Sequence, residues 1–177
     1  MGVKVMQAGG VANYSDVALG VYYAAAKGAE VINISLGGYA DSSALKAAVE
    51  SVLNQTFQDF EFIIVDDAST DGTDNILQSV GDQRLRLFRN PENQGLTSSL
   101  ITCIAAAAGD YIARIDADDI SLPQRLEKQV AFLDTHSNVV LMGCNYSIID
   151  HQGRGLGKGV SVPVGDRLIR EKLPEFN

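Results

Sequence analysis

The chain has 177 residues, a formal net charge of −8 at pH 7 and two cysteines. This length suits one domain whose single core needs no disulfide bonds, and the negative charge argues against binding to nucleic acid or to an anionic membrane surface. The longest uncharged apolar stretch, residues 100–108, is too short to span a bilayer, so the sequence predicts a soluble protein of cytoplasmic type with no membrane partner.

Short runs rich in valine and isoleucine alternate with longer segments of helical period, which is the pattern of repeated βα units. The predicted strands cover residues 3–6, 31–35, 60–66, 85–88, 111–116 and 139–146. The predicted helices begin at residues 15 and 41 and, later in the chain, cover residues 73–80, 95–108 and 123–135. A hairpin with a glycine-rich loop is expected after the last strand. The pattern predicts an α/β fold, a three-layer α/β/α sandwich with a mostly parallel, Rossmann-like sheet.

Two acidic clusters each follow a predicted strand: D-D-A-S-T-D-G-T at residues 66–73 and D-A-D-D at residues 116–119. Because parallel strands end at one edge of a sheet, where α/β folds bind their ligands, we expect the clusters to meet there. Strand alternation would place Asp116 and Asp118 on one side, about 7 Å apart. That spacing suits a shared hard cation such as Mg²⁺ or Mn²⁺.

Both clusters also have a purely structural interpretation. Asp66 and Asp67 could simply end a strand and begin the turn into the next helix, and Asp116 and Asp118 could form a solvated acidic strand end. Four clustered acids without matching lysines are costly unless a cation is present, which favours a metal and a phosphorylated ligand.

Four motifs occur in order: S-V-L-N-Q-T-F at 51–57, F-I-I-V-D-D-A-S-T-D-G-T at 62–73, N-P-E-N-Q-G-L at 90–96, and Y-I-A-R-I-D-A-D-D-I-S-L-P-Q-R-L from residue 111. By these motifs the chain from about residue 51 to 153 resembles the nucleotide-binding half of an inverting family 2 glycosyltransferase of the GT-A fold.

The resemblance implies UDP or another nucleotide diphosphate sugar as ligand, together with Mn²⁺ or Mg²⁺. It implies that Asp118 binds the metal, that Asp116 binds the ribose or the metal, and that Asp66 or Asp67 binds the base. Arg114 and Arg125 are candidate charge partners for the phosphates or the carboxylates. No catalytic residue is assigned, because the family's acceptor half with its catalytic base would begin about where this chain ends.

Residues 3–49 carry motifs similar to those of a different protein family. V-K-V at 3–5, Y-S-D-V-A-L-G-V-Y-Y-A-A-A-K-G-A-E-V-I-N-I-S-L-G-G at 14–38 and S-S-A-L-K-A-A-V at 42–49 resemble an internal piece of a subtilisin-like serine protease. That piece contains no histidine, since His136 and His151 are the two in the chain, which argues against proteolysis.

Together the two resemblances predict a chimera. We expect one domain over residues 1–177, in which a subtilisin-like βαβα segment (1–49) is joined to a truncated glycosyltransferase-like segment (50–177). At the junction, the strand at 31–35 could pair with the strand at 111–116, could pair directly with the strand at 3–6, or could be completed in a segment-swapped dimer.

The functional prediction from these resemblances is an engineered chimera without native catalytic activity. At most it would bind a nucleotide or nucleotide sugar in a metal-dependent way through Asp66, Asp67, Asp116 and Asp118. The alternative is a functional family 2 glycosyltransferase, or part of one, that transfers a sugar from a nucleotide-sugar donor. A third interpretation is a scaffold with no ligand.

Overall fold

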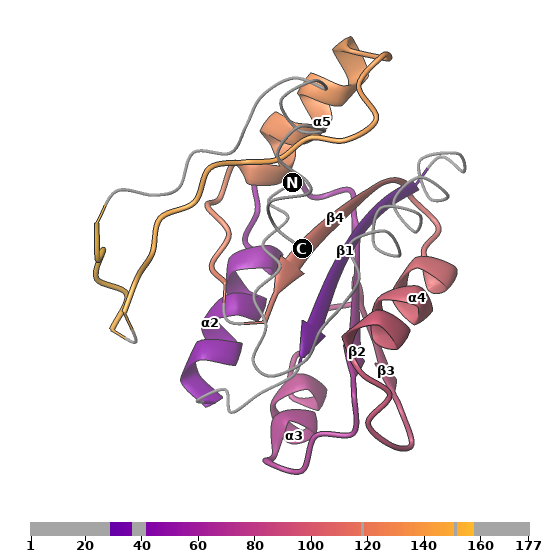
Figure 1. Ribbon diagram of the computed structural model, residues 1–177, viewed down its shortest axis with the longest axis vertical. Coiled ribbons are helices and arrows are strands. Elements are labelled where there is room, and N and C mark those ends of the chain that lie inside the picture. Colours follow the sequence, from indigo (N-terminus) through magenta and orange to yellow (C-terminus); the bar gives the residue numbers. More distant parts are fainter. Residues whose placement is uncertain (1–28, 37–41, 118, 151, 158–177) are drawn as a thin grey trace, which may run out of the picture.

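A computed structural model describes residues 29–36, 42–117, 119–150 and 152–157. In these residues four parallel strands form an open sheet in the order β3-β2-β1-β4, with helices on both of its faces (Figure 1). The strands are β1 (Ala29–Leu36), β2 (Glu61–Asp66), β3 (Leu85–Arg89) and β4 (Asp110–Asp116). The helices are α2 (Ser42–Leu53), α3 (Thr73–Gln78), α4 (Leu96–Ala106) and α5 (Arg125–Thr135). The predicted α/β/α class is confirmed.

The register of the strands brings their carboxyl ends into one row. β1 lies between β2 and β4, with Leu36 beside Asp66 on one side and Ser35 beside Asp116 on the other. β3 continues the row, because Arg89 lies beside Asp66. β1 therefore pairs with the strand that carries the second acidic cluster, which was one of the alternatives for the junction. The strand predicted at 3–6 and the helix predicted at 15–28 lie outside the described residues.

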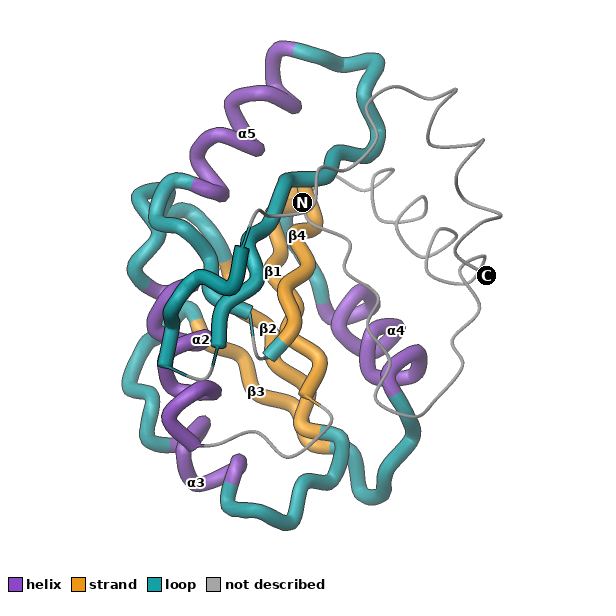
Figure 2. Tube along the Cα trace, turned by 60° about the vertical axis from the view of Figure 1, so that its left-hand side comes forward, coloured by secondary structure: helices purple, strands orange, loops and turns teal. Residues whose placement is uncertain are grey.

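The core has two parts, one on each face of the sheet. On one face the apolar stripe of α2 packs with α3, α5 and alternate residues of β2, such as Phe62 and Ile64. On the other face Ile63 and Val65 pack with Cys103 of α4. Figure 2 shows α4 on the side of the sheet opposite α2 and α3. Burial on both faces explains why β2 is a continuous apolar run rather than an alternating one.

The prediction of a strand at 139–146 is wrong. This segment has a single bridge position, at Tyr146, and otherwise no strand or helix, and Val140 and Leu141 are exposed. Valine-rich composition favours a strand only where a neighbouring strand and a packing surface are available, and within the described residues no ladder forms here. A tight turn follows, in which Ile149 bridges Gly155 in antiparallel fashion, as expected for the start of the predicted hairpin.

The remaining boundaries differ from the predictions by a few residues. α5 begins at Arg125, so Pro123 precedes the helix instead of lying in its first turn. Within the part of the chain that the structure describes, no helix has the length and apolar character needed to cross a membrane.

Candidate functional site

The two acidic clusters lie at the same edge of the sheet. Asp66 is the last residue of β2 and Asp116 the last residue of β4, and β1 alone separates them. Two strand spacings put their backbones roughly 10 Å apart. This distance suits a ligand that spans the end of β1, with a group at each side.

Asp66 is buried, with 1% of its surface exposed. Its Oδ1 accepts a hydrogen bond of 2.9 Å from the Ser69 amide, and its Oδ2 forms an ion pair of 3.2 Å with Nη1 of Arg89. Arg89 also reaches Asp74 Oδ2 at 3.1 Å and the Ser69 carbonyl at 2.9 Å. Arg89 thus fixes the loop between β2 and α3 around the first acidic cluster.

Asp67 organises a second loop at this edge. Its Oδ1 accepts hydrogen bonds from Asn90 Nδ2 at 2.7 Å and the Gln94 amide at 2.9 Å, and its Oδ2 accepts one from the Gly95 amide at 2.8 Å. Burial opposes ionisation of this carboxyl, but the accepted hydrogen bonds outweigh it and hold the pKa of Asp67 below its usual value. Asp67 is therefore a charged anchor for the N-P-E-N-Q-G-L motif.

Asp116 is paired within its own strand. Nη2 of Arg114, itself nearly buried, lies 2.5 Å from Asp116 Oδ1. The chain then turns, and the Asp119 amide donates to the Asp116 carbonyl at 3.1 Å. Because β4 ends at Asp116, strand alternation gives no spacing to the next carboxylate, and Asp118 lies outside the described residues.

Arginine side chains, rather than lysines, supply the positive charge beside the two acidic clusters. Arg89 pairs with the first cluster and Arg114 with the second, so the charge-repulsion argument for a cation is weaker than the sequence suggested. Arg125 donates to the Arg114 carbonyl at 2.7 Å and to Ser121 Oγ at 3.0 Å. Burial lowers the pKa of Arg125 from its ordinary value, with Asp119 among the groups that oppose this effect.

A divalent cation fits this edge only if a bound ligand supplies part of its coordination. Within the residues described, no group of three or more His, Cys, Asp and Glu side chains could hold a metal ion. Mg²⁺ and Mn²⁺ sites on nucleotides, however, often use one or two protein carboxylates and take their other ligands from phosphates and water. Asp116 supplies one such carboxylate at the carboxyl edge.

Sequence reasoning missed Arg89 and Asn90 as parts of this edge, and it missed Gln55 as a contact of the loop that leaves it. Asn90 and Gln55 belong to motifs already quoted, whereas Arg89 had only its position at a strand end as a signal. Gln55 is 1% exposed and contacts the loop that follows the second acidic cluster.

Comparison with known proteins gives a consistent result. The model of the family "Glycosyl transferase family 2" matches residues 39–167. "Putative glycosyltransferase EpsE" of Bacillus subtilis (strain 168) is 41% identical over 136 residues, which cover 75% of this chain and 49% of that protein. A β-1,3-glucosyltransferase of Escherichia coli, WfaP, is 33% identical over 119 residues, which cover 67% of this chain and 47% of that protein. The chain spans about half the length of these curated relatives.

Solved structures show the same fold. Residues 1–349 of S. aureus TarS superimpose with a TM-score of 0.55 at 24% identity, covering 62% of this chain and 33% of that one. The mannosyltransferase PcManGT from Pyrobaculum calidifontis, solved in complex with GDP-Man and Mn²⁺, gives a TM-score of 0.51 at 23% identity, covering 68% of this chain and 40% of that one.

These matches overturn the prediction of an inactive, engineered chimera. The family match covers residues 39–167 and so includes the junction expected near residue 50, and the similarity to EpsE covers three quarters of the chain. The comparisons lend no support to a subtilisin-like origin of residues 3–49. The chain belongs to glycosyl transferase family 2.

Proposed function

We propose that this chain contains the donor-binding part of a glycosyltransferase that transfers a sugar from a nucleotide diphosphate sugar. The observation that carries the proposal is the position of Asp66 and Asp116 on either side of β1, at the carboxyl edge of the sheet. In open α/β sheets this edge is where nucleotides bind.

In this proposal the two acidic clusters serve different parts of the donor. Asp116 and Asp118 face the diphosphate and hold Mn²⁺ or Mg²⁺ against it, while Asp66 or Asp67 faces the base. When bound, the cation neutralises the diphosphate that leaves with the nucleotide. Arg114 orients the Asp116 carboxylate through its 2.5 Å contact, and Asp67 holds the loop at residues 90–95 in place through three hydrogen bonds.

The base of the nucleotide is an open choice between two candidates. PcManGT was solved with GDP-Man, and the name of WfaP specifies UDP-Glc as its donor. Both nucleotides therefore belong in the first experiment.

The proposal is tested by isothermal titration of UDP and GDP, each with and without Mn²⁺, into the wild-type protein and the variants Asp116→Asn and Asp118→Asn. We expect Mn²⁺-dependent binding of one nucleotide by the wild type, weakened about tenfold or more by either substitution because a charge-assisted ligand is lost. The matched control is Asp110→Asn, the same substitution on β4 at the opposite edge, roughly 20 Å from Asp116 along the strand, which should bind like the wild type.

Two outcomes contradict the proposal. One is the absence of binding at millimolar nucleotide with Mn²⁺ present. The other is an equal loss of affinity in the Asp110→Asn control. If the wild type does not bind and Asp116→Asn raises thermal stability, the ligand-free scaffold is the better description.

A further inference from the structure

The loop between β4 and α5, residues 117–124, begins within the second acidic cluster. Its described residues belong to no helix or strand, so other parts of the chain must hold their backbone. A segment about 70 residues earlier, Ser51 to Thr56, does so. The Ser121 amide donates to Ser51 Oγ at 3.0 Å, and the Thr56 amide donates to the Pro123 carbonyl at 2.8 Å.

Gln55 makes the central contacts between the two segments. Its Nε2 donates to the Leu122 carbonyl at 2.8 Å and to the Ser51 carbonyl in the last turn of α2 at 3.0 Å. Its Oε1 accepts from the Leu126 amide at 3.0 Å. Because the side chain is 1% exposed, water cannot replace these partners without opening the structure.

One of these bonds compensates for a missing helix cap. The first amides of a helix have no partner within the helix, and the residue at the N-cap of α5, Gln124, makes no side-chain capping bond. Leu126 carries one of those amides, and Gln55 Oε1 accepts its hydrogen bond. Gln55 thus fixes both the loop and the start of the helix that follows it.

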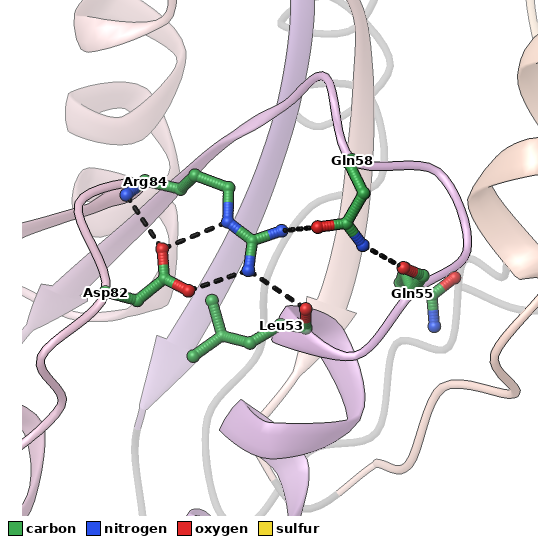
Figure 3. Close-up of polar contacts among 5 residues, drawn as sticks. All are labelled: Leu53, Gln55, Gln58, Asp82 and Arg84. Atoms are coloured by element: carbon green, nitrogen blue, oxygen red, sulfur yellow. Dashed lines mark hydrogen bonds and ion pairs between the residues drawn. The ribbon is translucent and has the colours of Figure 1, made fainter.

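The backbone of Gln55 is braced from the opposite side, as Figure 3 shows. Its carbonyl accepts a hydrogen bond from Gln58 Nε2, and Gln58 Oε1 accepts one of 3.0 Å from Arg84 Nη1. Arg84 is held by Asp82 and donates to the Leu53 carbonyl at 3.0 Å. The end of α2 is therefore tied to the start of β3 on one side and, through the Gln55 side chain, to the loop at residues 117–124 on the other.

We infer that Gln55 is a positioning residue of the donor site, which holds the loop after Asp116 in the geometry that the diphosphate and its cation require. This inference rests on the proposed function. A binding group must be held to within about 0.5 Å to be effective, and an irregular loop reaches that precision only through contacts such as these. Loss of the Gln55 amide should therefore weaken cation-dependent nucleotide binding even where the protein remains folded.

The first test compares Gln55→Leu with Cys103→Ala. Leucine is close in size to glutamine but cannot hydrogen-bond, and Cys103 lies in the core on the other face of the sheet, so its loss lowers stability without touching the loop. At a temperature where both variants are folded by circular dichroism, we expect Gln55→Leu to weaken Mn²⁺-dependent binding of the nucleotide diphosphate about tenfold or more. Cys103→Ala should bind like the wild type. Equal affinities in the two variants would overturn the inference.

Gln55→Glu adds a signature that a general loss of stability does not produce. A buried carboxyl group has a raised pKa, and only its protonated form can donate to the Leu122 carbonyl as the amide does. The affinity of Gln55→Glu relative to the wild type should therefore rise as the pH is lowered from about 8 to about 5, a window above the ordinary carboxyl pKa of about 4.3, because burial raises the pKa of the introduced carboxyl. A ratio that does not change with pH contradicts the positioning role. If Gln55→Leu does not fold, Ser51→Ala, which removes the acceptor of the Ser121 amide, takes its place.

Failure of the inference and failure of the proposed function give different results. If the wild type binds neither UDP nor GDP with Mn²⁺, the proposed function fails and the inference fails with it. If the wild type binds and Gln55→Leu binds equally well, only the inference fails. Hydrogen exchange at the Leu126 amide provides the structural check, because exchange there should be faster in Gln55→Leu than in Cys103→Ala.

Discussion

Ala68 lies at the centre of the first acidic cluster in a left-handed backbone conformation, with φ of 61°. The chain turns sharply here, because Asp66 accepts the Ser69 amide while Asp67 reaches across to the loop at residues 90–95. A residue with a Cβ atom is strained in this conformation, at a cost of roughly 1–2 kcal/mol. The strain is kept because the two neighbouring carboxylates determine the path of the chain.

Replacing Ala68 with glycine should therefore stabilise the protein. We expect Ala68→Gly to raise the free energy of unfolding by about 0.5–1 kcal/mol, since relief of the strain exceeds the added entropy of the unfolded chain. The control is Ala47→Gly within α2, where the same change should lower stability by about 1 kcal/mol. Urea denaturation of the two variants measures both values, and a loss of stability in Ala68→Gly would show that its backbone is not strained.

The carboxylates of the site also differ in what could be predicted about them. That Asp66, Asp67 and Asp116 end strands followed from the apolar runs before them. The hydrogen bonds that Asp67 accepts from Asn90, Gln94 and Gly95 could not be predicted, because those partners lie more than twenty residues away in the chain. Whether these aspartates contact a nucleotide remains a prediction.

At the scale of elements, an ion pair joins the start of β3 to the end of α2. Asp82 accepts hydrogen bonds from Arg84, which lower the pKa of its carboxyl from 3.8 to about 2. Arg84 in turn binds the Leu53 carbonyl and lies over the ring of Phe60, with Cζ 4.6 Å from the centroid. The pair lies at the amino edge of the sheet, away from the acidic clusters.

This pair predicts a specific acid sensitivity. Because the pKa of Asp82 is lower in the folded state, its contribution to stability is complete above about pH 4 and is lost as the pH falls toward 2. Asp82→Asn should thus lower the free energy of unfolding at neutral pH by at most about 1 kcal/mol, and the difference from the wild type should vanish near the low end of that window. Denaturation curves across the pH range test this, with Asp59→Asn as an exposed control.

Elements differ in how well their sequence predicts them. The apolar stripe of α2, with Leu45 and Val49, predicts a helix with one buried face. The apolar run of β2, with Ile63 and Ile64, predicts a buried strand. The segment at 139–146 has similar composition, but a strand also requires a partner, and composition cannot supply one.

At the scale of the whole molecule, we propose that the described elements form one cooperative domain. The two core clusters lie on opposite faces of the same sheet and share the backbone of β2. Any opening of that strand exposes both clusters, so neither should unfold alone.

The domain proposal predicts a single unfolding transition. In a Cys144→Ser background, reaction of the Cys103 thiol reports the cluster beneath α4, since burial raises the pKa of this thiol to about 12 and makes it unreactive in the folded protein. The denaturation midpoint measured by thiol reactivity should coincide with the midpoint measured by far-UV circular dichroism. Leu45→Ala, in the other cluster, should lower both midpoints together, consistent with a loss of about 2–5 kcal/mol. Two separate midpoints would contradict a single domain.

The largest error of the sequence interpretation also belongs to this scale. The local resemblance over residues 3–49 predicts a separate origin for this segment and, with it, an inactive chimera. The family match from residue 39 onward crosses the supposed junction. Parallel βα units share strand length, twist and crossover, so short stretches of unrelated α/β proteins can look alike without a common origin.

The sequence by itself determined the alternation of strands and helices, the ending of β2 and β4 in acidic clusters, and the motifs of the family, because periodicity and turn chemistry are local properties. The tertiary structure alone decided that β1 lies between the two clusters, that arginines balance them, and that Gln55 holds a loop about 70 residues away. These contacts depend on strand order and on the crossovers that connect the strands. Residues distant in the chain become neighbours only when the whole sheet has formed.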